Sequence, residues 1–277
     1  MNIKNIFLKT FLKIMIFIAI VLFFSPIISL ILPEPLMKHV YHEIAFQVIS
    51  RNELPKSVLQ EELIQRALDY TRSHLWVTGG FSPYKGKPFD YLLEGIGWCD
   101  YHAKVFCKLL ATKGIHARYD FLMDKDGISP HTIAEVYYKG KWRALDPYFN
   151  LIYYKDTEEW AELGEVTPKL ISELPRVVLM QNNKDEYGSL MYLTNRIFPL
   201  PRPHQRSDDF LGEKHIFDII TDSYVNIFGL NFAYWYQDIF INLRLKKIKD
   251  SANRLWYQAR NYDLFGRLEK AEPIYRK

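Results

Sequence analysis

The sequence predicts an α+β fold, in which a helix packs on an antiparallel sheet, with an N-terminal transmembrane helix and a mostly helical C-terminal annex. Residues 99–114 carry apolar side chains at helical spacing and end in a glycine, which favours a helix. Residues 14–32 contain no charged side chain. Three further segments alternate between apolar and polar side chains as strands do, and they cover residues 115–123, 131–138 and 141–146.

Composition places the chain among folded proteins. It has 277 residues, 48% hydrophobic and 25% charged, which fits one large domain or a domain with an annex. The net charge of +4 is mild and no basic stripe is interleaved with aromatics, so we expect no nucleic-acid partner. The only two cysteines, Cys99 and Cys107, lie about 12 Å apart along one predicted helix, too far for a disulfide. Cys107 falls on the apolar side of that helix and is predicted to be core.

The N-terminal apolar run predicts a membrane segment. Residues 14–32 are long enough to cross a hydrocarbon layer of about 30 Å, so we expect an uncleaved signal anchor in contact with the lipid bilayer. A cleaved signal peptide and a buried helix are the alternatives; Pro26 would kink the span without excluding it. Lys4, Lys9 and Lys13 precede the run, which favours a cytoplasmic N-terminus and a single-pass protein whose remainder is periplasmic or extracellular.

Composition shifts divide the rest of the chain. Ser57 followed by Gln60 has the form of a capping box that opens a helix, and the Gly and Pro content of residues 79–90 predicts a loop. The expected parts are a cytoplasmic stub and anchor (1–35), a juxtamembrane segment (36–56), a central core (57–165) and the aromatic-rich, mainly helical annex (166–277).

The annex contains a second strongly apolar stretch, residues 215–247. Asp218, Asp222 and Asp238 interrupt it, and acids are costly in lipid, so a packed helical region is favoured over a second span. Trp235 and Tyr236 are candidates for contact with the bilayer surface. The same region is a candidate docking surface for a partner in a membrane complex.

Cys99 lies where a glycine-containing loop becomes a helix. A helix N-terminus favours a thiolate, but a nucleophile also needs a base that a third group holds in place. A two-residue turn at 139–140 makes paired positions sum to 279, so His131 and Asp146 become diagonal neighbours on one face, about 7–8 Å apart along the backbone. A three-residue turn would put them on opposite faces.

These motifs resemble the transglutaminase-like superfamily. The resemblance covers residues 94–150 and is carried by Gly97-Trp98-Cys99 opening a helix, "KGIHAR" after it, His131 starting a strand, and then "EVYYKGKW" and "LDP". It implies a papain-like α+β core with Cys99 as nucleophile, His131 as general base and acid, and Asp146 orienting His131. The chain departs from the crosslinking enzymes of the family, because Asp100 stands where they have an aromatic residue and no calcium loop is recognisable.

The resemblance implies a cysteine hydrolase or acyltransferase, and the predicted N-terminal anchor makes it membrane-anchored. It would act outside the cytoplasm on a peptide, protein or other amide-bearing substrate through a thioester, with hydrolysis favoured over crosslinking and without a cofactor. The alternative is a non-catalytic or weakly catalytic binding or scaffolding module of the same fold.

Two details of the site stay open in the sequence. Backbone N–H groups at the helix start are the natural oxyanion donors, and Trp76 and Trp98 are side-chain candidates. Cys99 and His102 with Cys107 or His116 match no common zinc spacing, so no metal site is predicted.

Overall fold

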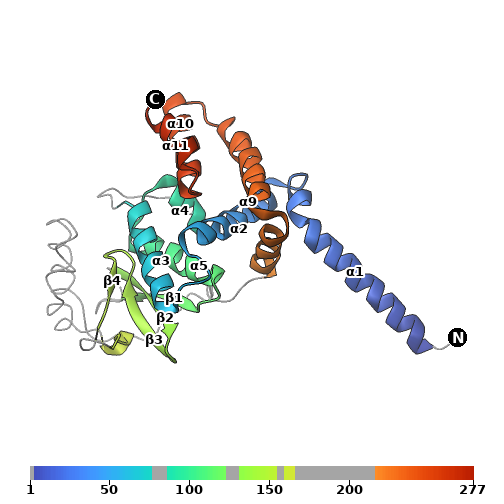
Figure 1. The fold of residues 1–277 in the computed structure, drawn as a ribbon, viewed down its shortest axis with the longest axis horizontal. Coiled ribbons are helices and arrows are strands. Elements are labelled where there is room, and N and C mark those ends of the chain that lie inside the picture. The colour runs from blue at the N-terminus through green and yellow to red at the C-terminus, as the bar shows by residue number, and fades with distance from the viewer. Residues whose placement is uncertain (1–2, 77–85, 123–130, 155–158, 166–215) are drawn as a thin grey trace. The chain divides into compact units, whose positions relative to one another are not determined.

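The computed structural model describes residues 3–76, 86–122, 131–154, 159–165 and 216–277. Helices pack on a four-stranded antiparallel sheet, and the C-terminal region is helical, so the α+β prediction is confirmed at this level (Figure 1). The chain divides into two compact units, one made of Met1–Val48 with His215–Ser251 and the other of Ile49–Lys214 with Ala252–Lys277.

The sheet follows chain order. Its strands are β1 (Ala117–Leu122), β2 (His131–Tyr138), β3 (Lys141–Asp146) and β4 (Leu151–Ile152). Lys139 and Gly140 have φ values of 50° and 81°, the left-handed pair that a two-residue hairpin turn requires. Tyr138 therefore pairs with Lys141, and the predicted register of this hairpin is confirmed.

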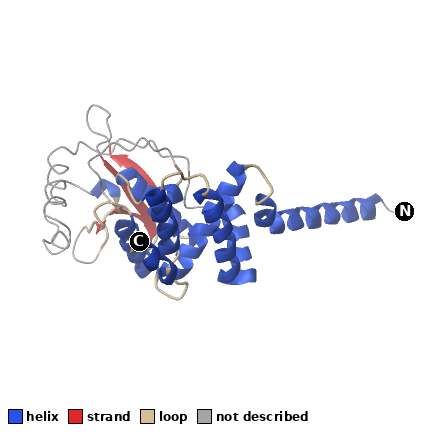
Figure 2. Cartoon of the chain, turned by 90° about the horizontal axis from the view of Figure 1, so that it is seen from above, coloured by secondary structure: helices blue, strands red, loops and turns tan. Residues whose placement is uncertain are grey.

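The sheet unit also contains helices, and Figure 2 shows helices beside the sheet. Those of this unit are α3 (Gln60–His74), α4 (Pro88–Glu94), α5 (Cys99–Thr112), α10 (Ser251–Leu264) and α11 (Leu268–Tyr275). α5 is the one that packs directly on the strands, against β1 and β2, and it also packs against α3 and α4. It ends as predicted, with Gly114 at φ 71° directly after the C-cap residue Lys113.

Two local predictions are wrong. α3 begins at Gln60 after an extended Leu59, so Ser57 does not open it, and the Gln60 amide donates to the Tyr137 carbonyl at 3.1 Å instead of closing a capping box. The predicted loop 79–90 overlaps α4, in which Pro88 occupies the first turn and the Lys87 amide donates to Asp90 at 3.1 Å. Residues 77–85 lie outside the described part of the chain.

The other unit is helical. It contains α1 (Ile3–Ser29), the first part of α2 (Glu34–Glu53), and α9 (Ile216–Leu245), which is broken at Gly229. The Ser29 and Tyr236 hydroxyls are 2.9 Å apart, and the rings of Tyr41 and Phe240 stack at 3.6 Å between centroids. Tyr236 is therefore buried and does not fit the predicted contact with a bilayer surface, whereas Trp235 is half exposed.

None of the described helices is, by itself, both long enough and apolar enough to span a membrane. Ile6–Val21 and Phe23–Ser29 meet the requirement together by length and composition, with a 45° bend between them, and a signal sequence would meet it equally. The anchor over residues 14–32 and the location outside the cytoplasm stay predictions.

The hairpin turn yields a prediction. A Cβ at Gly140 would meet no atom within 4 Å, so Gly140→Ala adds only the strain of its positive φ, and we expect it to lower the free energy of unfolding by about 1 kcal/mol. Gly164→Ala, in the 3-10 turn Leu163–Glu165, meets equally open space and is the matched control. Urea denaturation measures both; equal losses would contradict the turn geometry.

Candidate active site

Cys99 is the first residue of α5, and Trp98 is its extended N-cap residue. The preceding loop is fixed by a parallel bridge to the end of α3, in which the Trp76 amide donates to Gly95 at 2.8 Å and the Gly97 amide donates to Trp76 at 3.1 Å. Cys99 is half-buried, so its thiol is held at a defined but accessible position.

The surroundings of this loop are tight. A Cβ on Gly97 would lie 3.0 Å from the Cβ of Tyr101, which explains a glycine two residues before Cys99. The side chains of Trp76 and Trp98 are 68% and 44% exposed, and their role as oxyanion donors stays a prediction. Cys107 is fully buried as predicted, and both thiols are free. Burial, helped by the charge of Asp120, raises the pKa of Cys107 far above its usual value, so Cys107 is unsuited to act as a nucleophile.

His131 and Asp146 meet at the end of the hairpin. His131 is the first residue of β2, Asp146 is the last of β3, and both are buried. The His131 Nε2 and Asp146 Oδ2 atoms are 2.6 Å apart, so the contact predicted from the register is confirmed. The Cys99 side chain hydrogen-bonds to the same imidazole. Because Nε2 faces Asp146, Nδ1 is the nitrogen left for the sulfur.

Charge at this site favours an imidazolium. Burial alone would lower the pKa of His131, but the charge of Asp146 and the hydrogen bond to it, with a smaller effect of Cys99, raise it to about 10. The structure thus brings the three predicted residues together in one contact network; their catalytic roles stay predictions.

Asp146 accepts four hydrogen bonds. The backbone amides of Tyr148 and Phe149 each donate to Oδ1 at 3.1 Å, and the Tyr153 hydroxyl donates to Oδ2 at 3.1 Å beside His131. A buried carboxylate is costly unless its lone pairs are satisfied. These donors therefore satisfy both oxygens of buried Asp146 and fix its orientation toward His131.

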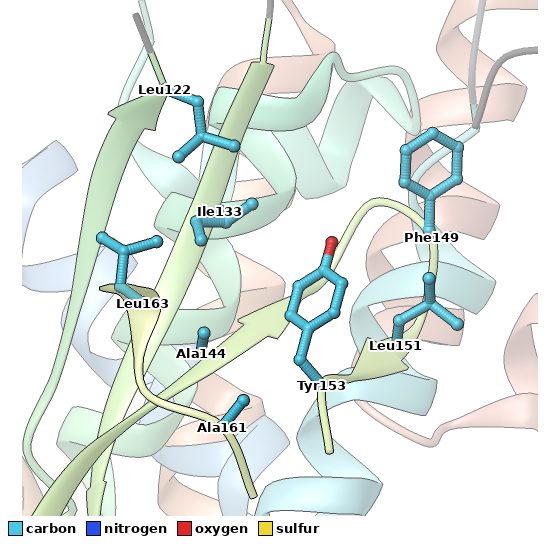
Figure 3. Close-up of a cluster of buried hydrophobic side chains, with 8 residues drawn as sticks. All are labelled: Leu122, Ile133, Ala144, Phe149, Leu151, Tyr153, Ala161 and Leu163. Carbon is cyan, nitrogen blue, oxygen red and sulfur yellow. The ribbon is translucent and has the colours of Figure 1, made fainter. Parts of the chain in front are cut away.

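The sequence reasoning missed Tyr153. Its ring belongs to a buried cluster drawn in Figure 3, which consists of Leu122, Ile133, Ala144, Phe149, Leu151, Tyr153, Ala161 and Leu163. Asn150 could have indicated a turn after the third strand, because asparagine tolerates a left-handed conformation; its φ is 56° here. It ends the turn after β3, and β4 follows, returning the chain along β3.

Two aromatic rings lie beside the His131 imidazole, those of Tyr148 and Phe149, with the Phe149 ring at 5.4 Å between centroids. The Tyr148 ring meets His131 and His102 edge-on, at 5.9 and 5.1 Å between centroids. Burial, with the charges of Cys99 and Asp146, raises the pKa of Tyr148 to about 12, so its hydroxyl keeps its proton.

Each ring nitrogen of His102 faces a carbonyl oxygen, and a neutral imidazole can donate to only one of the two. Its Nδ1 lies 2.9 Å from the Trp98 oxygen and its Nε2 lies 3.2 Å from the Leu75 oxygen. Burial lowers the pKa of His102 to about 4, although both carbonyls oppose this shift. Both ring nitrogens face carbonyl oxygens, so His102 is not placed to bind zinc with Cys99. In the described ranges, no group of three or more His, Cys, Asp or Glu side chains could hold a metal ion.

The hairpin, the helix that begins at Cys99 and the buried His131–Asp146 pair belong to an α+β fold. Residues 44–147 match the family model of the Transglutaminase-like superfamily, and this match contains Cys99, His131 and Asp146. These residues form a transglutaminase-like superfamily domain, as the sequence motifs predicted. No curated protein and no solved structure matched the chain.

Tyr153→Phe tests the support of Asp146. The variant keeps the ring in the buried cluster and removes one hydrogen bond to a charged acceptor, so we expect a loss of about 1–3 kcal/mol in the free energy of unfolding. Tyr154→Phe, at the neighbouring position, should change it by less than about 0.5 kcal/mol. Chemical denaturation of both variants measures the difference, and equal effects would show that the Tyr153 hydroxyl is dispensable.

The lowered pKa of His102 predicts that the free energy of unfolding falls at acid pH, which gives the pH profile of stability an acid limb. With a pKa of about 4 in the folded chain and about 6.5 when unfolded, its contribution is present above pH 6.5 and is lost as the pH falls toward 4. The shift corresponds to on the order of 3 kcal/mol. His102→Gln should flatten this limb, and the exposed His116→Gln should retain it. Urea denaturation between pH 7 and 4 distinguishes the two, and an unchanged limb in His102→Gln would refute the assignment.

Proposed function

We propose that this protein is a cysteine hydrolase or acyltransferase with Cys99 as nucleophile, His131 as general acid and base, and Asp146 as the residue that orients His131. The observation that carries the proposal is the 2.6 Å contact between His131 and Asp146, with the Cys99 side chain hydrogen-bonded to the same imidazole. The transglutaminase-like match over residues 44–147 supports the same reaction class.

In the acylation step, His131 holds the proton of the Cys99 thiol, and the sulfur attacks the carbonyl carbon of an amide. The raised pKa of His131 supports an imidazolium paired with a thiolate as the reactive state. A carbon–sulfur bond forms, the carbon–nitrogen bond breaks, and the imidazolium gives its proton to the leaving amine. The product is a thioester, and His131 is left neutral.

The second step releases the acyl group and regenerates the Cys99 thiolate. Neutral His131 removes a proton from water, or from an acceptor amine, as that molecule attacks the thioester carbonyl. The new carbon–oxygen or carbon–nitrogen bond replaces the carbon–sulfur bond, and the thiolate–imidazolium pair returns. Asp146 stays ionised throughout, held by its four donors, and stabilises the imidazolium.

The N-terminus of α5 supplies the donors for the tetrahedral intermediate. The amides of Tyr101 and His102 bond to the Trp98 carbonyl and begin the helix, so the N–H groups of Cys99 and Asp100 precede the first helical bond. A negative oxygen formed on the carbon bonded to Cys99 Sγ lies next to these groups. The helix dipole adds to this stabilisation.

For the substrate we propose a peptide, protein or other amide, with hydrolysis favoured over crosslinking. The chain has Asp100 after its nucleophile, where the crosslinking enzymes have an aromatic residue; Asp100 contacts Lys104 at 3.3 Å. For location we propose a membrane-anchored domain outside the cytoplasm. The bent helical pair within residues 6–29 and the lysines that precede the apolar run support this.

The experiment is alkylation of the full chain with iodoacetamide, with each cysteine quantified separately by mass spectrometry. We expect Cys99 to react at least about 100-fold faster than it does in His131→Ala, because that variant has no base to take the thiol proton. Asp146→Asn should slow the reaction of Cys99 similarly while the chain stays folded. The buried Cys107 is the internal control and should stay inert in all three proteins.

Equal, slow labelling of Cys99 in wild type and His131→Ala would remove the catalytic assignment. It would favour a binding or scaffolding module of the same fold. Profiling the wild-type chain against peptide, amide and amine-donor libraries then separates hydrolysis from acyl transfer.

A further inference from the structure

Arg260, on α10, lies far beyond the matched residues 44–147 and is nevertheless buried in the sheet unit. Its Nε donates to the Leu92 carbonyl at 3.1 Å, and its Nη2 donates to the His74 carbonyl. Leu92 is in the last turn of α4 and His74 is the last residue of α3. One guanidinium thus binds the C-terminal carbonyls of two helices, where a cation is favourable.

Residues 74–76, at and just after the end of α3, connect this contact to the nucleophile. The His74 carbonyl accepts a hydrogen bond from Arg260, and the Leu75 carbonyl faces His102 Nε2 at 3.2 Å. Trp76 exchanges two backbone hydrogen bonds with the loop before Cys99. Three consecutive residues therefore tie α10, α5 and the nucleophile loop to one another. A shift of the His74 carbonyl would be transmitted directly to that loop.

The loop itself also touches Arg260. A Cβ on Gly95 would lie 3.4 Å from Arg260 Nη2, and Gly95 has φ 69°, so a side chain here would be strained as well as crowded. Gly95 accepts the bridge hydrogen bond from Trp76. The guanidinium consequently packs against the residue at which α4 ends and the loop to Cys99 begins.

A second contact joins α10 to the same place. The Tyr257 hydroxyl donates to the carboxylate of Glu94, the last residue of α4, from a position one turn before Arg260. The hydroxyl and the guanidinium therefore act on α4 from one side of α10.

We propose that Arg260 and Tyr257 are positioning residues for Cys99, through which α10 sets the loop of residues 95–98 and hence the thiol against His131. This inference deepens the proposed function and rests on it, because the positioned residue is its nucleophile. Neither side chain touches the reacting atoms. Arginine is required because its planar fork reaches two carbonyls on different helices, whereas a lysine ammonium is a single point of charge.

The test compares Arg260→Lys and Tyr257→Phe with Arg254→Lys, a matched change at an exposed position of α10. In the full chain we measure the alkylation rate of Cys99 and, by NMR, the hydrogen exchange of the Gly97 amide. Ala134, in the centre of β2, is the reference for global opening. We expect Arg260→Lys to slow Cys99 and to accelerate Gly97 exchange by about tenfold each, with about threefold for Tyr257→Phe. Ala134 and the Arg254→Lys variant should stay at wild-type rates.

The outcomes separate the two proposals. Wild-type rates of both readouts in Arg260→Lys and Tyr257→Phe overturn the positioning role and leave the proposed function standing. Faster Gly97 exchange, with Cys99 slow even in wild type, supports the role of α10 and refutes the proposed function. Parallel acceleration of Gly97 and Ala134 means general destabilisation and also overturns positioning. If Arg260→Lys does not fold, Tyr257→Phe decides, since it removes only a hydroxyl.

Discussion

The site depends on a buried carboxyl group whose two oxygens are fully hydrogen-bonded. Asp146 is fully buried, and two backbone amides, a tyrosine hydroxyl and an imidazole all donate to it, which offsets the loss of water at this polar group. The hairpin register is the condition for this arrangement, since a slip of one residue would move Asp146 to the other face. The left-handed turn at Lys139–Gly140 fixes that register and so fixes the orientation of His131.

Two histidines beside the same tyrosine ring have opposite electrostatic environments. His131 faces a carboxylate and a thiol and favours its protonated form, whereas His102 faces two carbonyls in a buried position and favours its neutral form. Their neighbour Tyr148 contacts both rings. The two rings therefore differ in charge: His131 favours its protonated form, whereas neutral His102 has a single N–H and can donate to only one of its two carbonyls.

Local sequence patterns predicted the parts of the fold whose causes are local. The Lys139–Gly140 turn, the flanking strands and the start of α5 at Cys99 depend on neighbouring residues and were readable. The capping box predicted at Ser57 was wrong, because α3 begins at Gln60, whose side-chain amide donates to the Tyr137 carbonyl on β2, a contact distant in sequence. The role of Arg260 could not be predicted for a related reason. Its acceptors, the Leu92 and His74 carbonyls, lie 168 and 186 residues away, and no local pattern indicates which distant helix packs against the ends of α3 and α4.

The place of α10 in the chain orders events during biosynthesis. A ribosome makes the loop, Cys99 and the hairpin well before it makes Arg260. The emerging polypeptide therefore carries Cys99 while the contacts of Arg260 with the ends of α3 and α4 are still missing. On the proposed roles, the Cys99 thiol of such a polypeptide reacts slowly, and it reaches full reactivity only when α10 packs against the ends of α3 and α4. The order of synthesis would then keep Cys99 at low reactivity until α10 has packed beside its loop.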